Sequence, residues 1–186
     1  ARVESAIFEL TTENAFGEGV GFDRCQVAVV TNVDPTEDLT RWFFDDVDRL
    51  VQAKRIAVDV VLPNGFAVLN AEDPLVAAMA ESCQGKTVFF AENAENSIVS
   101  GHIAQGGTAV ITDEGKVQLV SEGTREEIVE IADLPWATEG ADFSLNLVLA
   151  AVAAAWAVDV PAWLIRAGLK SFSFTSEKFF QPERAE

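Results

Sequence analysis

The chain has 186 residues, of which 49% are hydrophobic and 23% are charged, a composition typical of one folded domain and not of a disordered or fibrous protein. Its 30 acidic residues outnumber its 13 basic residues and give a formal net charge of −17. Because this charge repels phosphate backbones and anionic lipid surfaces, we expect neither nucleic acid nor a membrane among its partners.

The first half of the chain alternates strand-like and helix-like segments. Apolar runs at 5–10 and 26–32 have the form of strands buried on both faces of a parallel sheet. From Thr36, acidic residues followed by apolar residues at helical intervals predict one long helix or two short ones. A predicted turn, a strand and a helix that opens at Asp73-Pro74 follow, at 62–65, 66–70 and 73–83.

The second half adds a change of pattern near its middle. Strand-like segments occur at 87–91, 108–112, 117–120 and 125–131, with a hairpin turn at 113–116. Helix-like segments occur at 98–105, 144–158 and 161–169. The sequence therefore predicts an α/β fold, a mostly parallel sheet flanked by helices on both faces with a small antiparallel addition at one edge.

Residues with obvious catalytic chemistry are few. His102 is the single histidine, lies among apolar positions, and is expected to have a packing or surface role. The glycines at 17–21 lack the GxGxxG spacing and precede a strand, so they form a weak candidate for a phosphate loop. Cys25 and Cys83 are too few for a disulfide framework and have no metal-binding spacing, which predicts a reduced, cytoplasmic protein.

Polar residues at the ends of predicted strands are better candidates, because ligands of open α/β sheets bind beyond the carboxyl ends of strands. Glu9 could hold Mg²⁺ together with Asp34, Glu37 or Asp38, although the segment 34–38 is expected first of all to cap a helix. Asn70 and Asp73 could bind a nucleotide, and the alternative is again a helix cap.

Five stretches carry a family resemblance by their order and spacing: GFDRC at 21–25, VVTNV at 29–33, VQAKR at 51–55, PNGFAVLNAEDPLV at 63–76 and NLVLAA at 146–151. Together they resemble the Mur-ligase-like region of cyanophycin synthetase, over about residues 3–172. VLNAEDPLVAAMA is the most specific of them. The resemblance implies an α/β domain at 1–172 and a tail at 173–186 that is the remnant of a linker to a lid domain.

The resemblance also implies an activity and its cofactors. Members of this family use ATP and Mg²⁺ to activate a carboxylate as an acyl phosphate and join it to an amine, here to extend a polymer of aspartate and arginine. By resemblance, Glu9 matches the glutamate that binds Mg²⁺, Asn70 and Asp73 match a pair near the nucleotide, and Asn146 matches an asparagine at the start of a helix.

The chain departs from the family's pattern where phosphates would be neutralised. By resemblance, the family's phosphate-binding glycine-lysine-threonine loop and the strand that carries it would precede Ala1. Thr12, Glu13 and Asn14 stand where the family has an arginine and two glycines. The segment 37–39 lacks the histidine of the family's Asp-His-Leu motif. Loss of these groups would leave little electrostatic stabilisation for phosphoryl transfer.

Two interpretations follow for the function. The first is a degenerate domain that serves as a scaffold or oligomerisation module of a cyanophycin-synthetase-like protein, with other domains or subunits, including further copies of the chain, as its partners. The second is a fragment of an active ATP-dependent ligase. A stand-alone acidic binding protein is a third alternative. Because the chain begins at Ala1 without methionine, we expect a piece of a longer protein. Surplus apolar surface at 42–44, Trp163 or 179–180 would suit a neighbouring domain or subunit.

Overall fold

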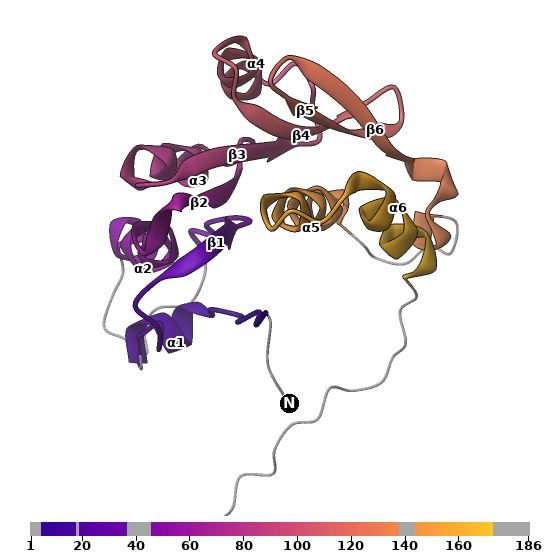
Figure 1. The fold of residues 1–186 in the computed structure, drawn as a ribbon. Helices are drawn as coiled ribbons and strands as arrows, with labels where there is room; N and C mark the ends of the chain where they lie inside the picture. Colours follow the sequence, from indigo (N-terminus) through magenta and orange to yellow (C-terminus); the bar gives the residue numbers. More distant parts are fainter. Residues whose placement is uncertain (1–4, 18, 37–45, 138–143, 173–186) are drawn as a thin grey trace, which may run out of the picture.

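The fold is an α/β sandwich around a six-stranded sheet. The computed structural model describes residues 5–17, 19–36, 46–137 and 144–172. The strands follow one another across the sheet in sequence order (Figure 1): β1 (Cys25–Val30), β2 (Val61–Asn70), β3 (Lys86–Ala91), β4 (Thr108–Asp113), β5 (Lys116–Ser121) and β6 (Thr124–Glu130). The first four strands are parallel, and β5 and β6 are antiparallel additions, so the predicted fold class is confirmed.

The helices form a layer on each face of the sheet (Figure 1). One layer connects the parallel strands and consists of α2 (Val47–Asp59), α3 (Pro74–Ala77), its 3₁₀ continuation Ala78–Ser82, and α4 (Ser97–Ala104). The other layer consists of α5 (Leu145–Ala157) and α6 (Ala162–Ser171), which follow two short 3₁₀ turns at Ile131–Asp133 and Pro135–Ala137. The short helix α1 (Thr12–Gly17) packs against α2. Each layer buries its own apolar core against the sheet.

Two predictions of local structure were wrong. The run 5–10 is not a strand: it has no regular structure, and Ile7 is 99% exposed. A strand needs a neighbour for its backbone groups, and none of the described strands pairs with this segment. The predicted turn at 62–65 lies within β2 instead, where the register with β1 shifts between the pairs Cys25–Val61 and Val27–Phe66. Gly65 permits this because a Cβ there would collide with the carbonyl oxygen of Gln26.

The other predicted elements are confirmed within a few residues, with two exceptions that involve undescribed segments. The helix predicted from Thr36 is represented by α2, which begins after the N-cap Asp46, and 37–45 lie outside the described residues, as do 173–186. Asp46 accepts a hydrogen bond from the backbone N–H of Asp48 at 2.9 Å, which satisfies one of the free donors at the start of α2.

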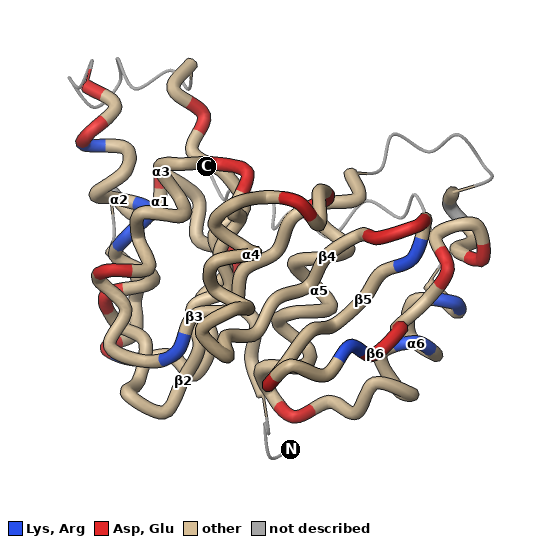
Figure 2. The backbone as a smooth tube through the Cα atoms, turned by 90° about the horizontal axis from the view of Figure 1, so that it is seen from above, with Lys and Arg blue, Asp and Glu red and all other residues tan. Residues whose placement is uncertain are grey.

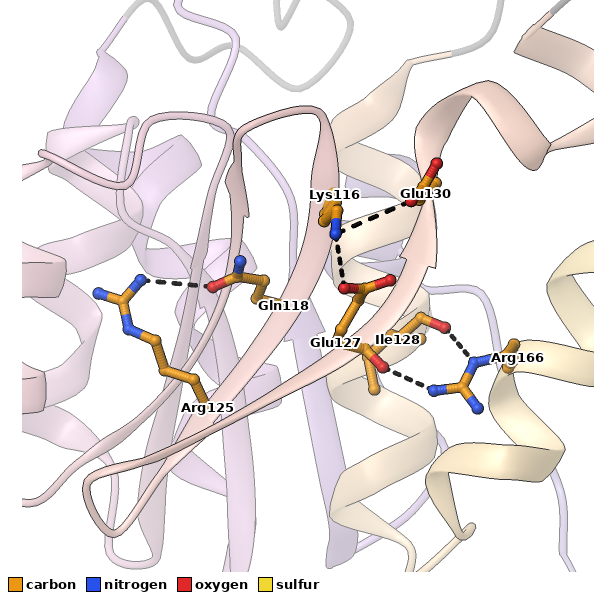
Figure 3. Close-up of polar contacts among 7 residues, drawn as sticks. All are labelled: Lys116, Gln118, Arg125, Glu127, Ile128, Glu130 and Arg166. Carbon is orange, nitrogen blue, oxygen red and sulfur yellow. Dashed lines mark hydrogen bonds and ion pairs between the residues drawn. The ribbon is translucent and has the colours of Figure 1, made fainter.

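The antiparallel edge is fixed by charged side chains (Figure 3). Arg166 on α6 donates from Nε to the carbonyl oxygen of Ile128 and from Nη2 to that of Glu127, both at 2.6 Å. Lys116 on β5 bonds the carboxylate of Glu127 at 2.8 Å and lies 3.8 Å from that of Glu130. These contacts attach α6 to β6 and hold the last two strands in register.

Charged residues are unevenly distributed over the fold (Figure 2). They occur on α2, in the loops and on β5 and β6, whereas 144–158, which includes α5, contains none. Among the helices that the structure describes, none is both long and apolar enough to cross a membrane.

Candidate functional site

The carboxyl ends of β1, β2 and β3 form the edge of the sheet where the sequence predicted a ligand site. Asn70, the last residue of β2, is buried there. Its amide donates from Nδ2 to the carbonyl oxygen of Thr31 at 2.9 Å, and its Oδ1 accepts from the backbone N–H of Glu72 at 2.9 Å. Asn70 therefore joins the ends of β1 and β2, and both polar atoms of its side chain already have a partner in the protein.

Asp73 is held in a similar way. Its Oδ1 accepts from the backbone N–H groups of Leu75 and Val76 at 2.9 and 3.3 Å, which caps α3. Its Oδ2 accepts from the backbone N–H of Val33, in the loop after β1, at 2.7 Å. The alternative of a helix cap is therefore confirmed for Asp73, and the structure adds a second bond that crosses to the neighbouring loop.

The loop between β3 and α4 has a similar helix cap and a similar bond to the neighbouring loop, made by residues that the sequence analysis did not select. Asn96 caps α4 by accepting from the backbone N–H groups of Ile98 and Val99, and its Nδ2 donates to the carbonyl oxygen of Ala71 at 3.1 Å. Glu72 accepts from the backbone N–H of Asn93 at 3.1 Å. An asparagine directly before the helical pattern of 98–105 was the available signal for the cap. Polar side chains thus tie each strand-end loop to the next.

Asn146 lies at the start of α5, and its geometry differs from that of the other predicted residues. Trp156, near the far end of α5, packs edge-on against Phe66, the residue at which β2 begins to pair with β3, with ring centroids 5.4 Å apart. This contact directs the first turn of α5, with Asn146, toward the carboxyl ends of the strands. The Oδ1 atom of Asn146 is buried and has no hydrogen-bond partner within the described structure. An unpaired buried acceptor costs about 1–3 kcal/mol, so a donor from a ligand would stabilise it.

Glu9 lies in the irregular segment before α1, and its side chain is exposed. It lines a surface hollow of about 250 Å³ together with Asn14, and the remaining lining residues are glycine or apolar: Phe8, Leu10, Gly19, Val20, Gly21 and Phe22. A smaller hollow of about 100 Å³ is lined by Leu10, Thr31 and Lys54 among others. Because Leu10 lines both hollows and Thr31 accepts from Asn70, Glu9 and the strand-end residues belong to one side of the molecule.

The proposed acidic partners of Glu9 are not arranged as a metal site in the described structure. Asp34 accepts from the hydroxyl and the backbone N–H of Thr36 at 2.7 and 2.8 Å, and these bonds hold the pKa of Asp34 below its usual value. Glu37 and Asp38 lie outside the described residues. Among the residues that are described, no three histidine, cysteine or acidic side chains form a group that could hold a metal ion. Because Mg²⁺ is usually held by one or two carboxylates together with substrate phosphates and waters, the metal role expected for Glu9 stays a prediction.

The remaining candidates from the sequence, His102 and the glycines at 17–21, have structural roles. His102 packs edge-on against Phe89, with ring centroids 5.0 Å apart, and its Nε2 lies 3.1 Å from the carbonyl oxygen of Thr87, so the predicted packing role is confirmed. Gly19 and Gly21 adopt positive φ angles of 75° and 67° in a loop that leads into β1 and not into a helix. This arrangement lacks the helix N-terminus that a phosphate-binding loop requires.

Comparison with known proteins gives this fold a family. The sequence model of the Mur ligase middle domain matches residues 1–155. The chain is 33% identical over 177 residues to the cyanophycin synthetase of Synechocystis sp., which covers 95% of this chain and 20% of that protein. It is 35% identical over 171 residues to the cyanophycin synthetase of Nostoc sp., which covers 91% and 19%. The chain thus spans about a fifth of the length of these relatives.

A solved structure agrees with this result at the level of the fold. A crystal structure of MurF from Acinetobacter baumannii superposes with a TM-score of 0.55 at 23% identity, over 81% of this chain and 29% of that one. The solved structure therefore has the same fold as the sheet with helices on both faces that is described here.

Proposed function

Because the chain belongs to the family of the Mur ligase middle domain, we propose that it is a degenerate member of that family. In this proposal it serves as a scaffold or assembly module of a longer protein similar to cyanophycin synthetase. The chain alone does not bind Mg-ATP tightly, and the chemistry of the longer protein resides in other domains.

The observation that carries this proposal is the hollow around Glu9. Its described lining contains the Glu9 carboxylate, the Asn14 amide, glycines and apolar side chains, and it includes no lysine or arginine. The β- and γ-phosphates of ATP carry several negative charges, and family members neutralise them with cationic groups and Mg²⁺. A lining of this kind supports repulsion of phosphates, to which the net charge of −17 adds.

The position of α1 adds a second reason. Thr12, Glu13 and Asn14, which replace an arginine and two glycines of the family, form the first turn of α1. Thr12 is buried there, and Glu13 is the acidic residue of this first turn. A helix in this place would bring backbone and carboxylate groups to where the family's pattern provides a flexible, positively charged segment.

The alternative is a fragment of an active ATP-dependent ligase that joins aspartate or arginine to a cyanophycin-type polymer. The buried, unpaired Oδ1 of Asn146 favours it, because a nucleotide base could donate a hydrogen bond to this atom. In the alternative, Asn70, Asp73 and Asn146 would surround the nucleotide, and Glu9 would hold Mg²⁺ through its carboxylate.

A restored variant distinguishes the two proposals. The triple substitution Thr12→Arg, Glu13→Gly and Asn14→Gly returns the family's residues and makes the net charge less negative by two. Glu81→Lys is the matched control, because it changes the charge equally at an exposed position before β3. One new arginine–phosphate bond of about 1.5–3 kcal/mol would raise the affinity for Mg-ATP about ten- to a hundredfold.

Isothermal titration with Mg-ATP measures the effect. If the substitutions account for the loss of binding, the triple variant binds at least about tenfold more tightly than the unmodified chain, and Glu81→Lys does not. Equal affinities for the triple variant and the control would contradict the proposal that this segment disabled the site.

A further inference from the structure

The polypeptide leaves β1, β2 and β3 at the carboxyl edge of the sheet, where the three strands are neighbours (Figure 1). Residues 31–33 follow β1, residues 70–73 end β2 and lead into α3, and residues 93–96 lead into α4. The middle segment, Asn70-Ala71-Glu72-Asp73, is only four residues long. Each of these four residues nevertheless forms a hydrogen bond with one of the two neighbouring segments.

The outer two residues of the middle segment bind the segment after β1. Asn70 donates from Nδ2 to the carbonyl oxygen of Thr31 at 2.9 Å, and Asp73 accepts from the backbone N–H of Val33 through Oδ2 at 2.7 Å. Asn70 and Val33 are buried, so loss of either bond would leave a buried polar group without a partner, which is unfavourable. These two bonds fix the position of residues 70–73 relative to the end of β1.

The inner two residues bind the segment before α4. The carbonyl oxygen of Ala71 accepts from Nδ2 of Asn96 at 3.1 Å, and Oε1 of Glu72 accepts from the backbone N–H of Asn93 at 3.1 Å. Within that segment, the N–H of Asn96 bonds the carbonyl oxygen of Asn93 at 3.1 Å. A shift of Ala71 and Glu72 therefore disturbs the bonds that hold residues 93–96.

Two of the side chains that join these segments also hold the first turn of a helix. Asp73 caps α3 through its Oδ1, and Asn96 caps α4 through its own Oδ1. A further bond, from the N–H of Glu72 to Oδ1 of Asn70, closes the middle segment on itself. Because the bonds to both neighbours come from four consecutive residues, a displacement that breaks the bonds on one side also moves the groups that are bonded on the other.

We propose that residues 31–33, 70–73 and 93–96, here called the loop relay, open and close as one unit and transmit a change at the end of β1 to the start of α4. Thr31 lines the hollow that also includes Leu10 and Lys54. Displacement of Thr31 by a molecule in that hollow weakens the bonds of Asn93 and Asn96. Coupling between two sites is a free energy and is therefore reciprocal, so a change at Asn96 also reaches the end of β1.

Two conservative variants break the loop relay at opposite ends and keep both helix caps. Asp73→Asn retains an oxygen for the cap of α3 but presents an amide group to the N–H of Val33. Asn96→Asp retains an oxygen for the cap of α4 but has no N–H to donate to Ala71. The first makes the net charge less negative and the second more negative, so a shared effect cannot arise from net charge. Glu122→Gln, at an exposed position in the turn between β5 and β6, is the matched control for a change of one charge.

Native-state hydrogen exchange of the 186-residue chain, followed by NMR, measures the opening of individual amides. The decisive amides keep their own partner in the variant: Asn93 in Asp73→Asn, and Val33 in Asn96→Asp. We expect each of them to exchange at least about fivefold faster than in the unmodified chain. The amides of β5, which lies between β4 and β6, are the reference for unfolding of the whole chain and should change less. Glu122→Gln should leave the rates at Asn93 and Val33 unchanged.

Three results would overturn the proposal. One is an unchanged rate at Asn93 in Asp73→Asn, which would show that the segments open independently. Another is acceleration in only one of the two variants, because the coupling must be reciprocal. The last is an equal acceleration at Asn93, at Val33 and in β5, which would show that these amides exchange only when the whole chain unfolds.

Discussion

Replacement of Asp73 by alanine probes the junction between β1 and β2 most sharply. The substitution removes the cap of α3, in which Oδ1 accepts from the N–H groups of Leu75 and Val76, and the bond from Oδ2 to the N–H of Val33. Loss of an N-cap costs about 0.5–2 kcal/mol. Val33 is only 5% exposed, so its N–H would be left without a partner at a further cost of about 1–3 kcal/mol. We therefore expect the free energy of unfolding to fall by about 1.5–5 kcal/mol.

Urea denaturation measures this loss, followed by tryptophan fluorescence. With a urea dependence of about 2 kcal/mol/M, the midpoint should decrease by about 0.8–2.5 M. Asp73→Asn should lose less, because an asparagine oxygen also caps helices, but its amide group cannot accept from Val33. The matched control is Asp34→Ala, since Asp34 is exposed and its hydrogen bonds to described residues are both with Thr36. Its effect should stay within about 0.5 kcal/mol, as is usual for surface positions. A loss below about 1 kcal/mol for Asp73→Ala would refute the structural role assigned to this carboxylate.

Three further predictions concern other parts of the fold. Arg166→Lys should lower the free energy of unfolding by about 1–3 kcal/mol and speed amide exchange in β6, because an ammonium group cannot reach both carbonyl oxygens; unchanged exchange would contradict this. Asn146→Leu should leave stability unchanged or raise it by up to about 3 kcal/mol, since it removes a buried unpaired acceptor; a clear loss in thermal denaturation would show that Oδ1 has a partner. Burial, with a contribution from Cys83, raises the pKa of the Cys25 thiol above its ordinary 9.0. The folded form therefore favours the protonated thiol. The contribution of this thiol to stability is complete below pH 9.0 and is lost as the pH rises through the higher pKa of the folded form. Alkylation of Cys25 in a Cys83→Ser variant should be slower in the folded chain than in urea, and equal rates would contradict it.

The elements that the sequence predicted correctly depend on neighbouring residues. The helix start at Asp73-Pro74 needs only the cap and the two N–H groups that follow, all within three residues. The hairpin of β4 and β5 likewise follows from a four-residue turn, and Glu114 and Gly115 adopt the positive φ angles that such a turn requires. Signals of this kind can be read from a short window of the sequence.

The predictions that failed depend on distant partners. Residues 5–10 have the composition of a buried strand, but a strand forms only beside another strand, and composition does not reveal whether one is available. Leu62-Pro63-Asn64-Gly65 has turn chemistry, yet the contact of Gly65 with Gln26, across to β1, keeps it in the sheet. In both places the outcome depended on residues that are distant in the sequence.

The candidate site shows the same division. The sequence placed Asn70 and Asp73 at a strand end, but not their bonds to Thr31 and Val33, which lie 39 and 40 residues away. It selected Asn146 by resemblance, and only the structure shows that its oxygen is buried without a partner. The metal role of Glu9 remains a prediction, because the segment 37–38 that would accompany it lies outside the described residues.

Titration of the unmodified chain with Mg-ATP, repeated with Glu9→Ala, tests the central claim most directly. If the chain is a degenerate scaffold, the dissociation constant is weaker than about 1 mM for both proteins, because the hollow around Glu9 offers no cation to the phosphates. Micromolar binding by the unmodified chain that Glu9→Ala abolishes would contradict the claim and establish a working nucleotide site.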